Sequence, residues 1–380
     1  MTSRSQRLKF TGALVALLSL VLGSLTIASA SARPAHARVQ KVRWHPNGAV
    51  DVIASTATRE FLGGSFTRMV NSQTHHQTRR VRIAALSRST GALDKSFHAR
   101  VNGTITALAV FNRKLFLGGD FTKVDGASRQ HLAALRLSDG GLVPSHIQVN
   151  GPVLTLLHMG GRLYVGGAFN QAGGVTRSKL FAMGRKGGLV SDWPAQTAST
   201  DGGVYVLAAS PHHDSVLVGG AFHHLVGQPR TFLGDITVAG AVTRSKAAAA
   251  CQTNCFVNDL AVGTRKVYAG ISGPGGHAAA YRLSNGATAW MLSTNGDVSA
   301  ISQSGSHLLL GGHFDKIAGH AHRMFAEVNA TTGHVMSRRL ATSGQRFPGI
   351  LDIDVRGPMA VLGGAFEAIN GQEHLADVAS

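Results

Sequence analysis

The chain has 380 residues, of which 44% are hydrophobic and 15% are charged, and it contains 47 glycines. This composition excludes a disordered chain and is typical of an ordered, β-rich protein. Lysine and arginine outnumber aspartate and glutamate 37 to 19, a balance that attracts polyanions.

The first element in the chain is an export signal. Three basic residues within the first nine positions precede a charge-free stretch, whose apolar centre runs from Ala13 to Ile27 and ends in small residues. This order predicts a signal peptide over residues 1–30 with cleavage after Ala30, and therefore a secreted or cell-surface protein. The alternatives are cleavage after Ala37 and an uncleaved membrane anchor. We expect membrane attachment only if the signal is uncleaved, and no nucleic-acid partner.

One phrase, Leu-Gly-Gly-x-Phe or a close variant, returns along the rest of the chain, with a degenerate copy in the fifth place. Its leading glycines are Gly63, Gly118, Gly166, Gly219, Gly270, Gly311 and Gly363. An apolar run precedes each copy, and a further strand-like segment follows it. Four strands per unit of this length are typical of a propeller blade. The sequence therefore predicts an all-β, seven-bladed β-propeller with four-stranded blades over residues 39–380.

The two ends of the chain predict how the propeller closes. The last residues, 375–380, match only the third strand of a unit. The segment 39–48 resembles the missing fourth strand, with Trp44 in the position where other units carry an aromatic residue. We expect the N-terminal strand to complete the seventh blade and close the ring, which removes open sheet edges.

The first unit carries a basic insertion between Phe66 and Ile83. It contains Arg79, Arg80 and Arg82, which are candidates for binding an anionic partner. The alternative is a solvated loop. A Gly-x-x-Arg phrase also recurs once per unit in three of the later units, which indicates a structural turn and not a specific site.

The two cysteines, Cys251 and Cys255, are separated by three residues. In an oxidising compartment so close a pair predicts a disulfide that clamps a short loop. Further ligands at metal-binding spacing do not accompany it, and the histidines are scattered along the chain, so we expect no metal site.

Two carboxylates occupy equivalent positions in the apolar runs. The third residue of each run is Val52, Ala107, Thr155, Val206, Asp259, Ala300 and Asp352. Near the axis of a propeller, Asp259 and Asp352 are candidates for binding a cation or lining a polar channel. Paired carboxylates also serve hydrolysis when their separation suits it. The alternative is a purely structural role at solvated strand ends.

The second unit resembles the delta-60 repeat family of bacterial β-propellers. The resemblance rests on Gly91-Ala-Leu-Asp-Lys-Ser-Phe97, Asn102-Gly103, Leu-Gly-Gly-Asp-Phe121 and Gly126, and weaker copies extend it over residues 39–380. It implies the propeller fold and exported proteins, and it brings no catalytic motif. The fifth unit departs from the pattern, with Gly273-Pro-Gly-Gly-His277 in place of the expected Phe.

Neither a Gly-x-Ser-x-Gly elbow nor a His-Glu-x-x-His helix occurs in the sequence, so the familiar hydrolase motifs are missing. We expect an exported, monomeric, non-catalytic binding or scaffold propeller without a cofactor. Its partner would be an anionic envelope polymer or a protein. The alternative is a propeller enzyme, a lyase or glycan hydrolase, with its site at the central channel.

Overall fold

The computed structural model describes residues 39–40, 42–144, 147–191, 193, 203–243, 255–343, 348–357, 359–369 and 375–379. The secondary structure of these residues is entirely β. They include no helix that is long and apolar enough to cross a membrane. The predicted signal peptide, residues 1–30, and its alternative as an anchor lie outside the described residues.

Each repeat forms an antiparallel sheet. The strand with the paired glycines is the second strand of the repeat, and it pairs with the first strand on one side and the third on the other. In the first repeat the order is β3 (Val50–Ser55), β4 (Arg59–Gly64) and β7 (Ile83–Ser87). The same order recurs in β8 (Ile105–Phe111), β9 (Lys114–Gly119) and β12 (Leu132–Arg136); in β13 (Val153–Met159), β14 (Arg162–Gly167) and β17 (Leu180–Gly184); in β18 (Val204–Ala209), β19 (Ser215–Gly220) and β22 (Leu233–Thr237); and in β27 (Val298–Ser304), β28 (His307–Gly312) and β31 (Phe325–Asn329).

Two of the repeats form sheets of four strands. They are β23 (Phe256–Val262), β24 (Lys266–Ser272), β25 (His277–Arg282) and β26 (Thr288–Ser293), and β33 (Ile350–Arg356), β34 (Met359–Gly364), β36 (Leu375–Ala379) and β1 (Val39–Gln40). In the second of these, Val39 pairs with Val378 and Gln40 with Asp377. The N-terminal segment therefore pairs with the last strand of the chain, as its sequence predicted.

Among the described residues, the expected fourth strand is reduced to one bridge in the other repeats, which differs from the prediction of four-stranded blades throughout. In the first repeat, Leu86 pairs with Leu93 and the ladder then stops. Just beyond the bridge, Asp94 Oδ1 accepts hydrogen bonds from the Ser96 N–H at 2.9 Å and the Ser96 hydroxyl at 2.6 Å. A local turn of this kind competes with a continued strand.

Trp44 also differs from its prediction. It lies in β2 (Trp44–Pro46), which pairs with β5 (Arg68–Asn71), and β5 pairs with β6 (Gln77–Arg79). The fourth strand of the last sheet therefore ends at Gln40, and Trp44 belongs to a separate sheet built on the insertion of the first repeat. Its side chain is buried among first-repeat residues and Val361.

Short hairpins follow the Phe of several repeats and were not predicted. They are β10 (Lys123–Val124) with β11 (Ala127–Ser128), β15 (Gln171–Ala172) with β16 (Val175–Thr176), β20 (His224–Leu225) with β21 (Gln228–Pro229), and β29 (Lys316–Ile317) with β30 (His320–Ala321). A similar small pair joins β32 (Thr342–Ser343) to β35 (Ala368–Ile369). The recurring glycines Gly126, Gly174 and Gly227 have positive φ at the hairpin turns, which confirms the structural interpretation of Gly-x-x-Arg.

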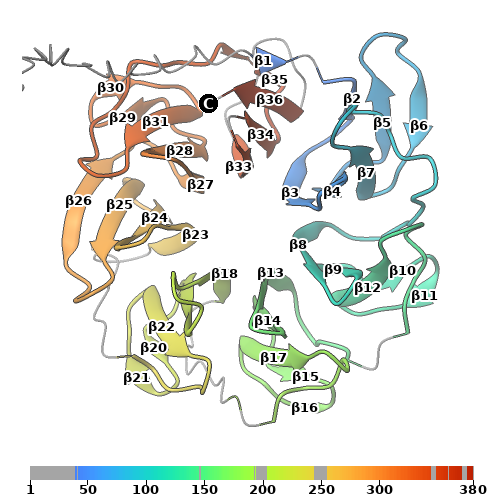
Figure 1. The fold of residues 1–380 in the computed structure, drawn as a ribbon, viewed down its shortest axis with the longest axis horizontal. Helices are drawn as coiled ribbons and strands as arrows, with labels where there is room; N and C mark the ends of the chain where they lie inside the picture. The colour runs from blue at the N-terminus through green and yellow to red at the C-terminus, as the bar shows by residue number, and fades with distance from the viewer. Residues whose placement is uncertain are drawn as a thin grey trace, which may run out of the picture. The chain divides into compact units, whose positions relative to one another are not determined.

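The innermost strands of successive sheets lie against one another. β3 contacts β8, and the contacts continue through β13, β18, β23, β27 and β33, which in turn contacts β3; Figure 1 shows these strands nearest a common centre. The hydrophobic core fills the spaces between neighbouring sheets, as where Phe61 and Phe97 pack with Ile105. A Cβ on Gly63 would lie 2.8 Å from Ile105 Cγ2, so the glycine permits the close approach of two sheets.

Candidate functional site

A cavity of about 160 Å³ lies among the innermost strands. Each of these strands carries a register shift at the same place, between Val50 and Val52 in β3 and between Val257 and Asp259 in β23. The extra residue of such a bulge leaves the ladder and turns toward a different face. The bulge residues all line the cavity: Asp51, Thr106, Leu154, Tyr205, Asn258, Ser299 and Leu351. The sequence did not predict the bulges, each of which shifts the inward and outward alternation of its strand by one residue.

Asp352 and Asp259 both line this cavity, so the structure brings the two predicted carboxylates to the same place. Asp352 lies in β33, and its Oδ2 accepts the Ile53 N–H of β3 at 2.5 Å. Its Oδ1 accepts the Ile353 N–H at 2.8 Å. Burial, together with the negative charge of Asp259, raises the pKa of Asp352 to about 8.

Asp259 makes the same connection two repeats earlier. Its Oδ1 accepts the Leu260 N–H and its Oδ2 the Ile301 N–H of the next inner strand, both at 2.8 Å. Burial raises the pKa of Asp259 to about 7, and the bond from the Ile301 N–H opposes that rise. Both oxygens of each carboxyl group are therefore engaged by backbone donors.

Thr155 occupies the corresponding position in the third repeat and has the same role. Its Oγ1 accepts the Leu207 N–H of the next inner strand at 3.1 Å. An unpaired buried N–H is costly, so these three polar residues stabilise the contact between neighbouring inner strands. The carboxylates consequently have a structural role in joining repeats.

Asp51 adds a third acidic side chain to the cavity. Burial raises its pKa to about 7, although the charge of Arg82 opposes the rise and that of Asp120 adds to it. The described residues contain no grouping of His, Cys, Asp and Glu with the geometry to hold a metal ion. In this cavity Asp259 and Asp352 are held by backbone bonds, an arrangement that does not favour the hydrolytic use of paired carboxylates.

The three arginines of the predicted basic loop have different environments. Arg79 is exposed at the end of β6. Arg80 is buried, and its Nη1 and Nη2 donate to the carbonyl oxygens of Arg79 at 2.9 Å and Asp94 at 3.2 Å. The same bond to the preceding carbonyl is made by Arg129, Arg177 and Arg230. Arg80 is thus the first repeat's copy of the structural arginine, which corrects its assignment as an anion-binding residue.

Arg82 is half-buried, and both its backbone N–H and its side chain donate hydrogen bonds to nearby carbonyl groups. It has a φ of 69°, and its N–H donates to the Phe66 carbonyl at 2.9 Å. Its guanidinium donates to the Ser65 carbonyl. Residues with positive φ stand in the corresponding place in later repeats: His131, Lys179, Phe232 and Met324. Arg79 therefore remains the accessible candidate of the three.

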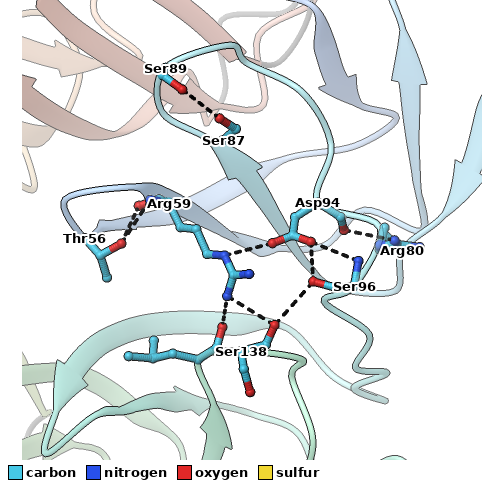
Figure 2. Close-up of polar contacts among 9 residues, drawn as sticks. Thr56, Arg59, Arg80, Ser87, Ser89, Asp94, Ser96 and Ser138 are labelled. Atoms are coloured by element: carbon cyan, nitrogen blue, oxygen red, sulfur yellow. Dashed lines mark hydrogen bonds and ion pairs between the residues drawn. The ribbon is translucent and has the colours of Figure 1, made fainter.

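Figure 2 shows a polar connection between the first and second repeats that the sequence did not predict. Arg59, the first residue of β4, forms an ion pair with Asp94 through Nε and Oδ2 at 2.8 Å. Its Nη1 also donates to the carbonyls of Leu137 and Ser138 in the turn of the second repeat. We call this arrangement the Arg59 clamp. It joins the start of β4 to the turn of the second repeat.

Cys255 lies immediately before β23 and is buried in the hydrophobic cluster of that sheet. Cys251 lies outside the described residues, so the Cys251–Cys255 disulfide stays a prediction. The departure of the fifth repeat from the pattern is visible in β24, which continues to Ser272 and pairs with β25 through Ile271 and His277.

No protein-family model and no curated protein matches the chain, so its resemblance to the delta-60 repeat family stays a prediction. Among solved structures it is similar to the WD40 β-propeller domain of Doa1, with 11% identity and a TM-score of 0.56 over 90% of this chain and 97% of that one. It is also similar to the computationally designed Ika8 protein, with 13% identity and a TM-score of 0.54 over 89% and 98% of the two chains. These similarities establish an all-β protein with a β-propeller fold.

Proposed function

We propose that this protein is an exported, non-catalytic, seven-bladed propeller that binds an acidic polymer of the cell envelope. Pairing of Val39 with Val378 and the contact of β33 with β3 support a ring closed by the N-terminal strand. The order of charge in residues 1–30 supports export. Membership of the delta-60 repeat family belongs to the same proposal.

The main support for the binding role is that acidic side chains are engaged by other groups of the protein. Asp94 is paired with Arg59, and Glu327 lies 3.1 Å from Arg338. Asp259 and Asp352 bind backbone N–H groups. Three of the 37 basic residues lie in the predicted signal peptide, so the mature chain has 34 basic and 19 acidic residues. This excess of positive charge attracts polyanions.

A sedimentation assay tests this function. The mature chain is mixed with insoluble, cross-linked polygalacturonate or with neutral cross-linked dextran, at low and at high salt. We expect capture by the anionic polymer that weakens as salt screens the charges, and none by dextran. Equal capture by both polymers, or capture by neither, would contradict the proposal.

Arg79 provides a local test with a matched control. Arg79→Ala removes an exposed charge that has no carboxylate partner among the described residues, and we expect about a twofold loss of affinity for the anionic polymer. Arg136→Ala lowers the net charge equally but removes a cation already paired with Asp139. A larger loss for Arg136→Ala than for Arg79→Ala would argue against a role for the basic loop.

A further inference from the structure

A second, larger pocket lies between the fourth and fifth repeats, where the turns between their first and second strands meet. Its volume is about 790 Å³, within the range of small-molecule sites. Ser215 at the start of β19, Lys266 at the start of β24 and Arg282 at the end of β25 line it. The sixth repeat contributes Ser306. The sequence analysis did not identify any of these residues.

The fourth repeat has a short side chain at the position where the first, third and fifth repeats have a long cation that crosses to the next turn. At the first position of the second strand, Arg59 reaches the turn of the next repeat. Arg162 Nη1 reaches Val238 O at 3.0 Å, and Lys266 Nζ reaches Thr331 O at 2.7 Å. Ser215 holds this position in the fourth repeat. A serine side chain is too short to cross, so the space before the next turn stays open.

Positive charge is concentrated on the fifth-repeat wall of this pocket. Lys266 and Arg282 are direct partners in the antiparallel register of β24 and β25, and like charges in that position oppose each other. Arg265 precedes Lys266, and both arginines are exposed. Burial and then the charges of Arg282 and Arg265 lower the pKa of Lys266. The fold therefore retains an unfavourable cluster of three cations.

Comparison with the second repeat shows which compensating charge is missing. The turn Arg136-Leu-Ser-Asp139-Gly corresponds to Arg282-Leu-Ser-Asn285-Gly. Asp139 pairs with Arg136 Nε at 3.0 Å and accepts the N–H of the second residue after it. Asn285 keeps the equivalent backbone bond, at 3.0 Å, but has no charge. Arg282 consequently has no carboxylate partner among the described residues.

The fourth-repeat wall has different chemistry. Asp214 is exposed at the pocket, and its Oδ1 accepts the Ser210 hydroxyl at 2.6 Å. Asp235 lies deeper and accepts the Thr243 hydroxyl at 3.3 Å. Carboxylate oxygens that already accept hydroxyl hydrogen bonds suit a ligand that itself carries hydroxyl groups. The pocket thus combines a cationic wall with a wall of hydroxyl acceptors.

We propose that this pocket binds an acidic saccharide, with Arg265 and Arg282 holding its negative group and Asp214 accepting its hydroxyls. Guanidinium groups match both carboxylate and phosphate, so the shared chemistry is a sugar that carries one of these anions. The inference rests on the proposed function, because it assigns the anionic polymer a site for one of its units.

Calorimetric titration of the mature chain tests the ligand class. The probes are a short oligogalacturonide, a sugar phosphate, inorganic phosphate alone and a neutral maltooligosaccharide. We expect one or both acidic sugars to bind at least tenfold more tightly than the neutral sugar and inorganic phosphate, and the tighter of the two identifies the anion. Equal binding of the neutral sugar, or of phosphate alone, would overturn the proposal.

Ser215→Arg tests the location of the site. It restores the residue found in the first and third repeats at this position and fills the pocket, so we expect at least a tenfold loss of acidic-sugar affinity. General electrostatic attraction predicts the opposite, because the variant adds a positive charge. Unchanged or tighter binding by the folded variant would therefore overturn the site.

Asn285→Asp is a second, more conservative test of the site. It keeps the turn and supplies a carboxylate partner for Arg282. We expect about a fivefold loss of affinity, and no change for the control Arg136→Ala. This variant decides the question if Ser215→Arg fails to fold, and unchanged affinity would then overturn the site. If wild type sediments with polygalacturonate while both pocket variants bind normally, only the pocket inference fails. If wild type does not sediment, the proposed function fails.

Discussion

The junction between the first and second repeats and the junction between the fourth and fifth are alike at the end of the second strand, where the paired glycines lie, but differ at its start. In the first, Arg59 crosses to the carbonyls of Leu137 and Ser138. In the second, Ser215 leaves a pocket of about 790 Å³. A repeat fold can therefore open a binding site by shortening one side chain, without changing its strands.

The paired glycines at the end of the second strands explain why this change is tolerated. A Cβ on Gly63 would approach Ile105 Cγ2 to 2.8 Å, and one on Gly219 would approach Val257 Cγ1 to 2.7 Å. Both sheets thus pack equally closely against the next inner strand. Close packing at the glycine end of the second strand holds the repeats together, so the residue at the start of that strand is free to vary.

The largest expected effect follows from this shared close packing. Gly63→Val and Gly219→Val each insert a branched side chain into a closed contact, and we expect each to lower the free energy of unfolding by about 3 kcal/mol. Urea denaturation of the two variants measures the effect. If only one variant were strongly destabilised, the two junctions would not share the same close packing.

The buried carboxyl groups between neighbouring inner strands predict that the stability of the fold depends on pH. Asp352 bonds across to Ile53, and the folded pKa values of Asp352 and Asp259 are raised to about 8 and about 7. The folded chain therefore holds protons that the unfolded chain has released above about pH 4. These two groups make stability fall as pH rises from about 4 to about 8, by up to about 1.4 kcal/mol per pH unit for each.

Urea midpoints at several pH values, compared between wild type and Asp352→Asn, isolate this contribution from that of the histidines. We expect the variant to lose less stability than wild type as the pH rises through this range. Parallel curves for the two proteins would show that Asp352 ionises normally in the folded state.

A smaller effect distinguishes the residues that begin the second strands. Arg59→Ala removes an ion pair and two hydrogen bonds to carbonyls, so we expect a loss of about 2 kcal/mol in the free energy of unfolding. Ser215→Ala removes the hydroxyl's hydrogen bond to Asp235 and a long contact to Asp214 at 3.5 Å, both within its own repeat, and we expect a loss of about 1 kcal/mol. Equal losses in urea denaturation would mean that the clamp does not stabilise its junction.

The smallest effect is expected for Asp139→Asn, which makes the turn of the second repeat match that of the fifth. Asp139 and Arg136 are exposed, and solvent screens such pairs, so the thermal unfolding midpoint should stay unchanged. Acidic-sugar affinity should not rise, because Arg59 still fills the junction. A new binding event in calorimetry would show that the uncompensated arginine alone creates a site.

Much of the fold was predictable from the sequence because it depends on local patterns. The recurring Gly-Gly marks the second strand of each repeat, and the apolar run before it marks the innermost strand. The pairing of Val39 with Val378 followed from the mismatch between the two ends of the chain. The fourth strands were over-predicted, since Asp94 forms a turn with Ser96 that ends the ladder.

The candidate sites were only partly predictable. Asp259 and Asp352 do lie together, because their repeats place them at equivalent positions. Arg80 was misassigned because the insertion of the first repeat hides its equivalence to Arg129 and the other structural arginines. The pocket at Ser215 was not predicted. A serine there matters only because other repeats have a long side chain at the same position, and the sequence does not show which groups those side chains contact.

The sequence by itself determined the repeat, the strand positions and the excess of positive charge, since each of these is written in local residue types and their spacing. Only the tertiary structure decided which cations are buried, which are compensated and where a junction stays open. The physical reason is that a side chain at one junction meets groups from the next repeat, about 50 residues away in the chain, and burial and charge compensation arise only from that meeting.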